Sequence, residues 1–219
     1  MGSGSQGSDR ERHLSWAPTK SRVEALVDGI FAVSMTLLVL NIKLPESARL
    51  ESNSELFSHF ASVSQSFWVY VLSFVVLAMF WVAHSYQFHL VERLDRGQLW
   101  VNFGFLLLTT TVPFTTNLVS MHTGLSAAVT VYACNLSLLG GALLLHIHRL
   151  RQRPSLATKE LTAALGRRVE RRLLLLFTVP LTAAVVAQVA PAWGMRLLVL
   201  LVLLHFFPNR SDGSGTSNL

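Results

Sequence analysis

Long apolar segments are the feature of this sequence that most constrains its fold. Six of them approach the roughly 20 residues that an α-helix needs to cross the hydrocarbon core of a bilayer. One such segment is compatible with a core helix of a soluble protein, but six are not. Charged residues make up only 14% of the chain, against about 25% in an average soluble domain. We therefore predict an all-α membrane protein with six transmembrane helices. The predicted spans are Ala25–Ile42, Phe57–Ala83, Leu99–Val119, Ala127–Leu145, Leu173–Ala190 and Ala192–Phe207, the last of them short.

Lysine and arginine gather in alternate loops. They precede the first span, separate the second from the third, and are most numerous in the linker Arg149–Arg172 between the fourth and fifth. The positive-inside rule then places both termini in the cytoplasm of a multi-pass protein of the cell's inner (plasma) membrane. A basic linker is also compatible with nucleic-acid binding. Topology and contact with the anionic lipids of the bilayer explain it, however, so we expect no nucleic-acid partner.

The sequence contains no catalytic motif that we can identify. It has no HExxH, CxxC or Walker-type pattern, and it lacks the TVGYG-type carbonyl filter. Its single cysteine, Cys134, lies inside a predicted span, which excludes an internal disulfide. We therefore expect neither an enzyme nor a cofactor. Glycine and serine are frequent at the ends of the chain, and we expect residues 1–19 and 209–219 to be disordered. Residues 20–208 then form one transmembrane domain.

Ionisable residues open the first span, where they are costly and usually functional. Glu24 and Asp28 are four residues apart and repel each other if both are ionised. Arg22 and Asp28 are six residues apart, so they do not pair along one helix. Asp28 therefore needs a hydrogen-bond donor from another helix, or it must hold a proton.

Candidate partners of Asp28 lie at the same depth in the next two spans. Trp81 and His84 are on one side of the second span, and Asn102 is about one turn inside the third. A polar network of these residues with Arg22 and Asp28 would satisfy the hydrogen bonding of each buried group. The alternative is that the tryptophan and histidine belong to an interfacial belt and that the asparagine joins two helices. Their convergence at one depth favours the network.

One face of the first span carries a regular stripe. At about 100° per residue, five side chains fall on one side of the helix, and Asp28 lies almost opposite. The stripe is small at its inner end and bulky and apolar further out. By itself, such a stripe is more often explained by contact with lipid or by packing. It consists of Gly29, Val33, Thr36, Leu37 and Leu40.

Three segments resemble the bacterial branch of the transmembrane protein 175 potassium channels. They are "RVEALVDGIFAVSMTLLVL", "FWVAHSYQF" and "DRGQLWVNFGFLLLTTTVPFTTNL". The family signature is Arg-x-x-x-Phe-Ser-Asp at the start of the first helix. This sequence keeps Arg22 and Asp28 but has Leu26 and Val27 in place of Phe and Ser. The resemblance covers the first three spans well, and the last three mainly in number and length.

The resemblance implies a six-helix subunit that assembles as a homotetramer around a central pore. The first helix of each subunit would line this pore, with no re-entrant filter loop. The apolar constrictions of the family would fall on Val33, Leu37 and Leu40, with Thr36 forming a ring of hydroxyls. Stacked apolar rings gate by dewetting. We therefore expect a potassium-preferring leak channel, with potassium as the permeant ion, in which Asp28 faces away from the pore and supports the helix.

Two alternatives remain open at this point. In the first, Asp28 and His84 form the titrating relay of a proton-coupled secondary transporter. Such transporters show inverted repeats or broken helices, and we find no convincing repeat. In the second, the protein is a non-conducting membrane scaffold whose linker Arg149–Arg172 recruits a partner. Ion flux from the purified protein distinguishes the three.

Overall fold

The fold is known from a computed structural model that describes residues 18–42 and 52–206. The ends expected to be disordered therefore lie outside the described residues, apart from Pro18 and Thr19. Within the described part the chain is helical, as predicted, with one isolated β-bridge between Val91 and Ala157. The helices are α2 (Lys20–Val39), α3 (Asn53–His89), α4 (Arg96–Met121), α5 (Ser126–Gln152), η1 (Pro154–Leu156), α6 (Ala163–Ala187) and α7 (Pro191–Phe206).

Each predicted span falls on one of the six α-helices. By length and composition, three of the described helices can cross a membrane, namely Val63–His89 of α3, α4 and α5. Helices α2 and α6 differ from these three because they carry more charged residues, and α7 is apolar but shorter. Helix α6 begins at Ala163, before the predicted membrane span that starts at Leu173. The hydroxyl of Thr162 accepts a hydrogen bond from the backbone N–H of Leu165 at 3.2 Å and caps the helix there. Capping therefore sets the start of α6, and the arginine-rich segment forms its first turns.

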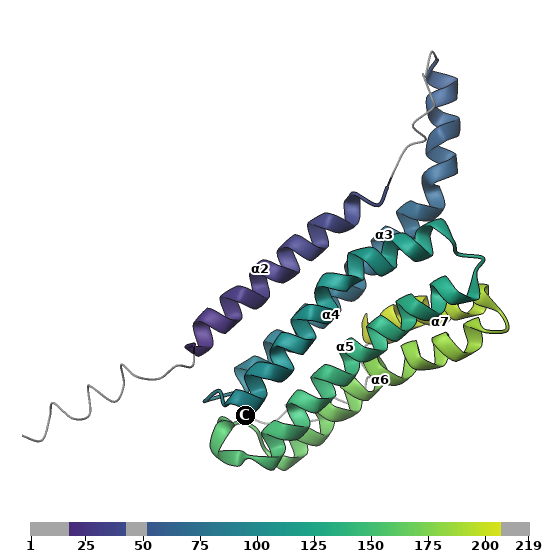
Figure 1. Cartoon of the computed structure of the whole chain (residues 1–219). Coiled ribbons are helices and arrows are strands. Elements are labelled where there is room, and N and C mark those ends of the chain that lie inside the picture. Colours follow the sequence, from purple (N-terminus) through teal and green to yellow (C-terminus); the bar gives the residue numbers. More distant parts are fainter. Residues whose placement is uncertain (1–17, 43–51, 207–219) are drawn as a thin grey trace, which may run out of the picture.

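The helices form an elongated bundle with α2 at one edge (Figure 1). The α3–α4 pair packs against α2, and α5 continues the bundle toward α6 and α7. Residues at helical spacing make up the packed face of α2, since Val23, Val27, Phe31, Ser34 and Leu38 are all buried. The ring of Phe31 lies 5.8 Å from the ring of Phe105 on α4, measured between centroids. One apolar face therefore holds α2 to the bundle.

The closest packing of two helices is between α5 and α6. A Cβ atom at Gly140 of α5 would lie 2.5 Å from the carbonyl oxygen of Leu176 on α6. Three residues earlier, the hydroxyl of Ser137 donates to the carbonyl oxygen of Phe177 at 2.9 Å. A small residue and a short polar one thus let the two backbones approach closely, as is common between membrane helices.

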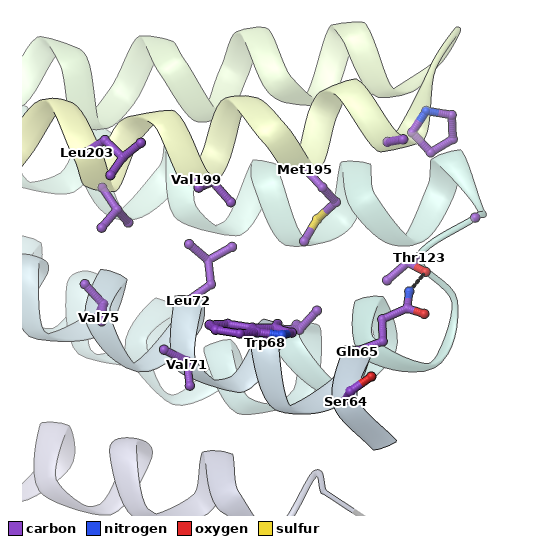
Figure 2. A pocket seen from close by; sticks show the side chains of 15 residues that line it. Ser64, Gln65, Trp68, Val71, Leu72, Val75, Thr123, Met195, Val199 and Leu203 are labelled. Atoms are coloured by element: carbon purple, nitrogen blue, oxygen red, sulfur yellow. Dashed lines mark hydrogen bonds between the residues drawn. The ribbon is translucent and has the colours of Figure 1, made fainter. Parts of the chain in front are cut away.

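Between α3 and α7 the packing leaves an apolar groove of about 960 Å³. Figure 2 shows Trp68 and Leu72 of α3 facing Met195 and Val199 of α7 across it. Its polar side chains gather at one end, where the amide of Gln65 donates to the hydroxyl of Thr123. None of the described residues that line this groove is charged.

Candidate functional site

The face of α2 that points away from α3 and α4 carries the predicted stripe. In the single chain, Val33 is 57% exposed, Leu37 43% and Leu40 65%. Thr36 is also exposed, and its hydroxyl donates to the carbonyl oxygen of Val33 at 2.8 Å. This bond leaves the lone pairs of the hydroxyl oxygen free to accept. The helix thus has one face packed against the bundle and one face that is exposed within the described part of the chain.

A shallow hollow of about 400 Å³ lies on the exposed side of α2. It forms where the small residues Ala25 and Gly29 leave room beside Val33 and Leu37, with Thr110 of α4 at its rim. A Cβ atom added at Gly29 would meet nothing within 4 Å. Small residues of this kind permit the close approach of another helix.

Of the three candidate partners, Asp28 bonds to Trp81 and not to His84 or Asn102. Its Oδ1 atom accepts a hydrogen bond of 2.8 Å from the indole N–H of Trp81 on α3. His84 instead bonds to the Oδ1 atom of Asn102 on α4, also at 2.8 Å. The structure thus brings four of the five predicted network residues into two pairs. Arg22 is exposed on the first turns of α2 and belongs to neither pair.

The two pairs differ in burial. His84 and Asn102 are buried between α3 and α4, whereas Asp28 and Trp81 are exposed in the single chain. The difference follows from the neighbouring helix that each side chain of α3 meets, since Trp81 bonds to Asp28 on α2 and His84 bonds to Asn102 on α4. Trp81 therefore reaches α2 at the surface, and His84 points into the bundle.

A second histidine that the sequence analysis missed lies close to the first. The rings of His84 and His146 on α5 are stacked at 6.3 Å between centroids, and Phe88 stacks against both. The Nδ1 atom of His146 is hydrogen-bonded to Gln87 at 2.8 Å. These contacts join α3, α4 and α5 through polar and aromatic side chains. The sequence carried one signal for this contact, since His84 and Gln87 are three residues apart and therefore lie on one face of the helix.

Two further polar contacts hold the ends of α2 and were also missed. The ammonium group of Lys20 donates to the carbonyl oxygen of Val91, just after α3, at 2.8 Å. At the other end, the amide of Asn41 donates to the carbonyl oxygen of Pro113 on α4 at 3.0 Å. With the bond between Asp28 and Trp81, these contacts attach α2 to its neighbours at both ends and between them. Within the described ranges, no group of three or more His, Cys, Asp or Glu side chains is arranged to hold a metal ion.

Part of this chain matches the model of a known family. Residues 22–113, which contain most of α2, all of α3 and the first part of α4, match the family described as "Endosomal/lysosomal potassium channel TMEM175". A potassium channel of Chamaesiphon minutus is 38% identical over 123 residues, which are 53% of this chain and 60% of that protein. A potassium channel of Streptomyces collinus is 35% identical over 101 residues, or 46% of this chain and 48% of that protein. The matched region thus spans about half to three-fifths of these relatives.

The fold agrees over a longer stretch than the sequence. The crystal structure of a lysosomal potassium-selective channel TMEM175 homolog from Chamaesiphon minutus superimposes with a TM-score of 0.72. The alignment covers 84% of this chain and 95% of that one, at 26% sequence identity. These relatives are ion channels and not enzymes. Residues 22–113 of this chain are thus similar to the TMEM175 family, and its fold is similar to that of a solved TMEM175 homolog.

Proposed function

We propose that this protein is a potassium-preferring leak channel whose pore is lined by α2 of four identical subunits. The observation that carries the proposal is the division of α2 into two faces. Its packed face and its polar contacts all lie toward α3 and α4, while its other face is apolar and exposed at the edge of the bundle. The named relatives are potassium channels.

In this assembly, Val33, Leu37 and Leu40 form three stacked apolar rings. Such rings resist wetting, so an ion must lose part of its hydration shell to pass them. No carbonyl ligands replace the lost water at these positions. Potassium holds its water less tightly than sodium and therefore crosses at a lower cost. The hydroxyls of Thr36 form a ring beside these constrictions and offer acceptor lone pairs to the passing ion.

The charged residues of α2 then support the pore helix and do not coordinate the ion. Asp28 fixes α2 to α3 through Trp81, and Arg22 lies toward the inner mouth of the pore. With both termini in the cytoplasm, as the basic loops predict, the charged end of α2 faces the cytoplasm. Asp28 and His84 make their hydrogen bonds to different partners, which gives no support to a relay between them.

Ion flux from proteoliposomes tests this proposal. The purified protein should release potassium down an imposed gradient, and sodium more slowly. Leu37→Asn nearly conserves side-chain size and adds a carboxamide that solvates ions, so conductance should rise several-fold while the preference for potassium falls. Leu138→Asn is the matched control, because Leu138 is an exposed leucine on α5, whereas the main contacts of α2 are with α3 and α4. We expect the control to conduct as the parent does.

Two results would contradict the proposal. Absence of potassium flux from correctly assembled protein would favour a non-conducting scaffold. Equal effects of the two asparagine substitutions would show that the stripe on α2 does not line the conduction path.

A further inference from the structure

The first half of α6 and the end of α5 enclose a groove of about 810 Å³. One end of it is basic, since Arg167 and Arg171 lie four residues apart on one face of α6 and are both exposed. Two like charges at this spacing repel each other, and an anion between them removes the repulsion.

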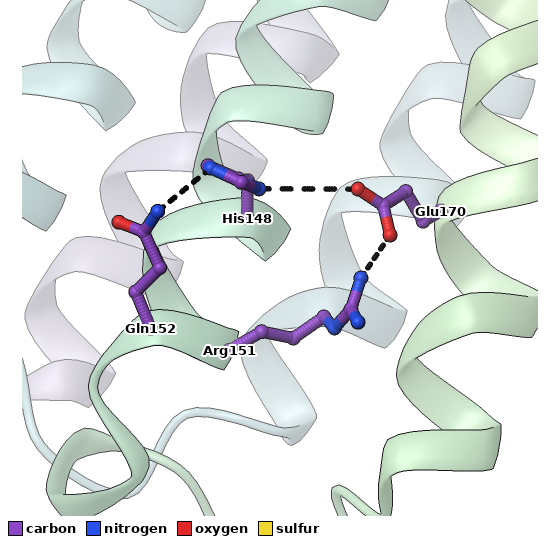
Figure 3. Close-up of polar contacts among 4 residues, drawn as sticks. All are labelled: His148, Arg151, Gln152 and Glu170. Carbon is purple, nitrogen blue, oxygen red and sulfur yellow. Dashed lines mark hydrogen bonds and ion pairs between the residues drawn. The ribbon is translucent and has the colours of Figure 1, made fainter.

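The acidic side chain of this groove already has positive partners. Glu170 forms an ion pair with Arg151, and its other oxygen lies 3.9 Å from Nδ1 of His148 (Figure 3). The amide of Gln152 donates to Nε2 of His148 at 2.8 Å, which leaves Nδ1 to carry the proton that faces Glu170. Since Arg151 balances the carboxylate, Arg167 and Arg171 give the groove a net positive charge.

The other end of the groove is apolar. Leu144 and Leu145 line it from α5, and Leu174 lines it from α6, one turn beyond Arg171. Leu145 is 48% exposed and Leu174 also 48%, so both present hydrocarbon surface outward. These leucines belong to the apolar part of a helix pair in which α5 is long and apolar enough to cross the membrane. Cationic and apolar surfaces therefore meet in one groove at the border of the apolar region.

We propose that this groove binds an anionic phospholipid. The phosphate lies between the guanidinium groups of Arg167 and Arg171, which match its geometry, and an acyl chain lies along the leucines. Basic pockets between transmembrane helices bind anionic headgroups in this way. A free phosphate ion would use only the arginines and would leave the leucines without a role. The site does not depend on ion conduction and lies on helices outside the pore assignment.

Lipid binding to the full-length, delipidated protein tests the proposal by native mass spectrometry. The probes are phosphatidylglycerol, phosphatidylcholine with the same acyl chains, and inorganic phosphate as a competitor. Phosphatidylglycerol should bind and phosphatidylcholine should bind far less. One arginine near an anionic lipid contributes roughly fivefold in affinity. R167Q/R171Q should therefore weaken phosphatidylglycerol binding about 25-fold, and each single substitution about fivefold.

R93Q/K159Q is the matched control. It removes the same charge at the same end of the molecule, because the segments around Val91 and Ala157 are paired there, but neither residue lines the groove. We expect it to bind phosphatidylglycerol as the parent does. An equal loss in both double variants would show unspecific attraction and overturn the site. Equal binding of the two lipids, or full displacement by millimolar phosphate, would overturn it too.

Discussion

The hydrogen bond between Asp28 and Trp81 is the direct polar link from the middle of α2 to α3. A carboxylate accepting from an indole N–H makes a charge-assisted bond, which is stronger than a neutral one. Both side chains are exposed in the single chain, so the contribution to stability lies at the lower end of the usual range, about 1–2 kcal/mol. The acid thus fixes the position of the helix on which it stands.

A double-mutant cycle measures this bond. Asp28→Ala and Trp81→Phe each remove one partner, so the double variant should lose less stability than the sum of the two single losses. We expect a coupling free energy of about 1 kcal/mol, obtained from unfolding in detergent. The control cycle pairs Asp28→Ala with Trp100→Phe, because Trp100 is exposed on α4 and packs against Phe103. The control cycle should be additive, and additivity in the first cycle would contradict the assigned bond.

At the scale of the helices, the contact between α5 and α6 depends on the absence of a side chain. A Cβ atom at Gly140 would press on the backbone of Leu176, which cannot turn away as a side chain can. At the next position, a Cβ atom on Gly141 would meet the ring of Phe177 at 3.4 Å, an ordinary contact. A side chain at Gly140 therefore requires a backbone shift, whereas Gly141 has room for a methyl group.

Alanine substitutions at these two positions should have opposite effects. Alanine favours a helix over glycine by up to about 1 kcal/mol. Gly141→Ala should therefore keep or raise the melting temperature in detergent. Gly140→Ala should lower it, because separating the two helices costs about 1–3 kcal/mol. Equal melting temperatures for the two variants would show that the backbones of α5 and α6 are not in close contact at Gly140.

The helices were predicted from the sequence better than their ends and partners. Helical spacing is local information and is enough to group Val33, Leu37 and Leu40 on one side of α2, but both sides of this helix are apolar, so spacing alone did not tell which side packs inside the chain. The apolar run that predicts the fifth span marks the hydrocarbon region and not the start of α6, which Thr162 caps several residues earlier. The partner of Asp28 was ambiguous because Trp81 and His84 were both available at the same depth. His146 was missed because its partner, Gln87, lies 59 residues away on another helix.

At the scale of the whole molecule, one chain holds a single α2, and one helix cannot enclose a pore. In the proposed pore, further copies of the chain pack on the exposed stripe and on the hollow beside Gly29. Identical subunits close such a contact by cyclic symmetry. In the proposed tetramer, four exposed faces of α2 meet around one axis.

Native mass spectrometry of the detergent-solubilised protein measures this stoichiometry. We expect the mass of four 24.2-kDa chains. Gly29→Leu should reduce the fraction of tetramer, because it fills the space into which a neighbouring helix fits. Gly124→Leu, at a position that also has open space, lies in the loop before α5 and should leave the fraction unchanged. A parent protein found only as monomers or dimers would contradict the pore assembly.

The bond between Asp28 and Trp81 also has a consequence for biosynthesis. The two residues are 53 positions apart, and a ribosome adds about 5–20 residues per second, so the indole follows the carboxylate by roughly 3–10 s. During that interval the acid lacks the indole donor that fixes α2 to α3 in the folded chain. Phe105, which receives the ring of Phe31, is synthesised later still. The first helix to leave the ribosome can therefore take its final place only after the second and third have followed it.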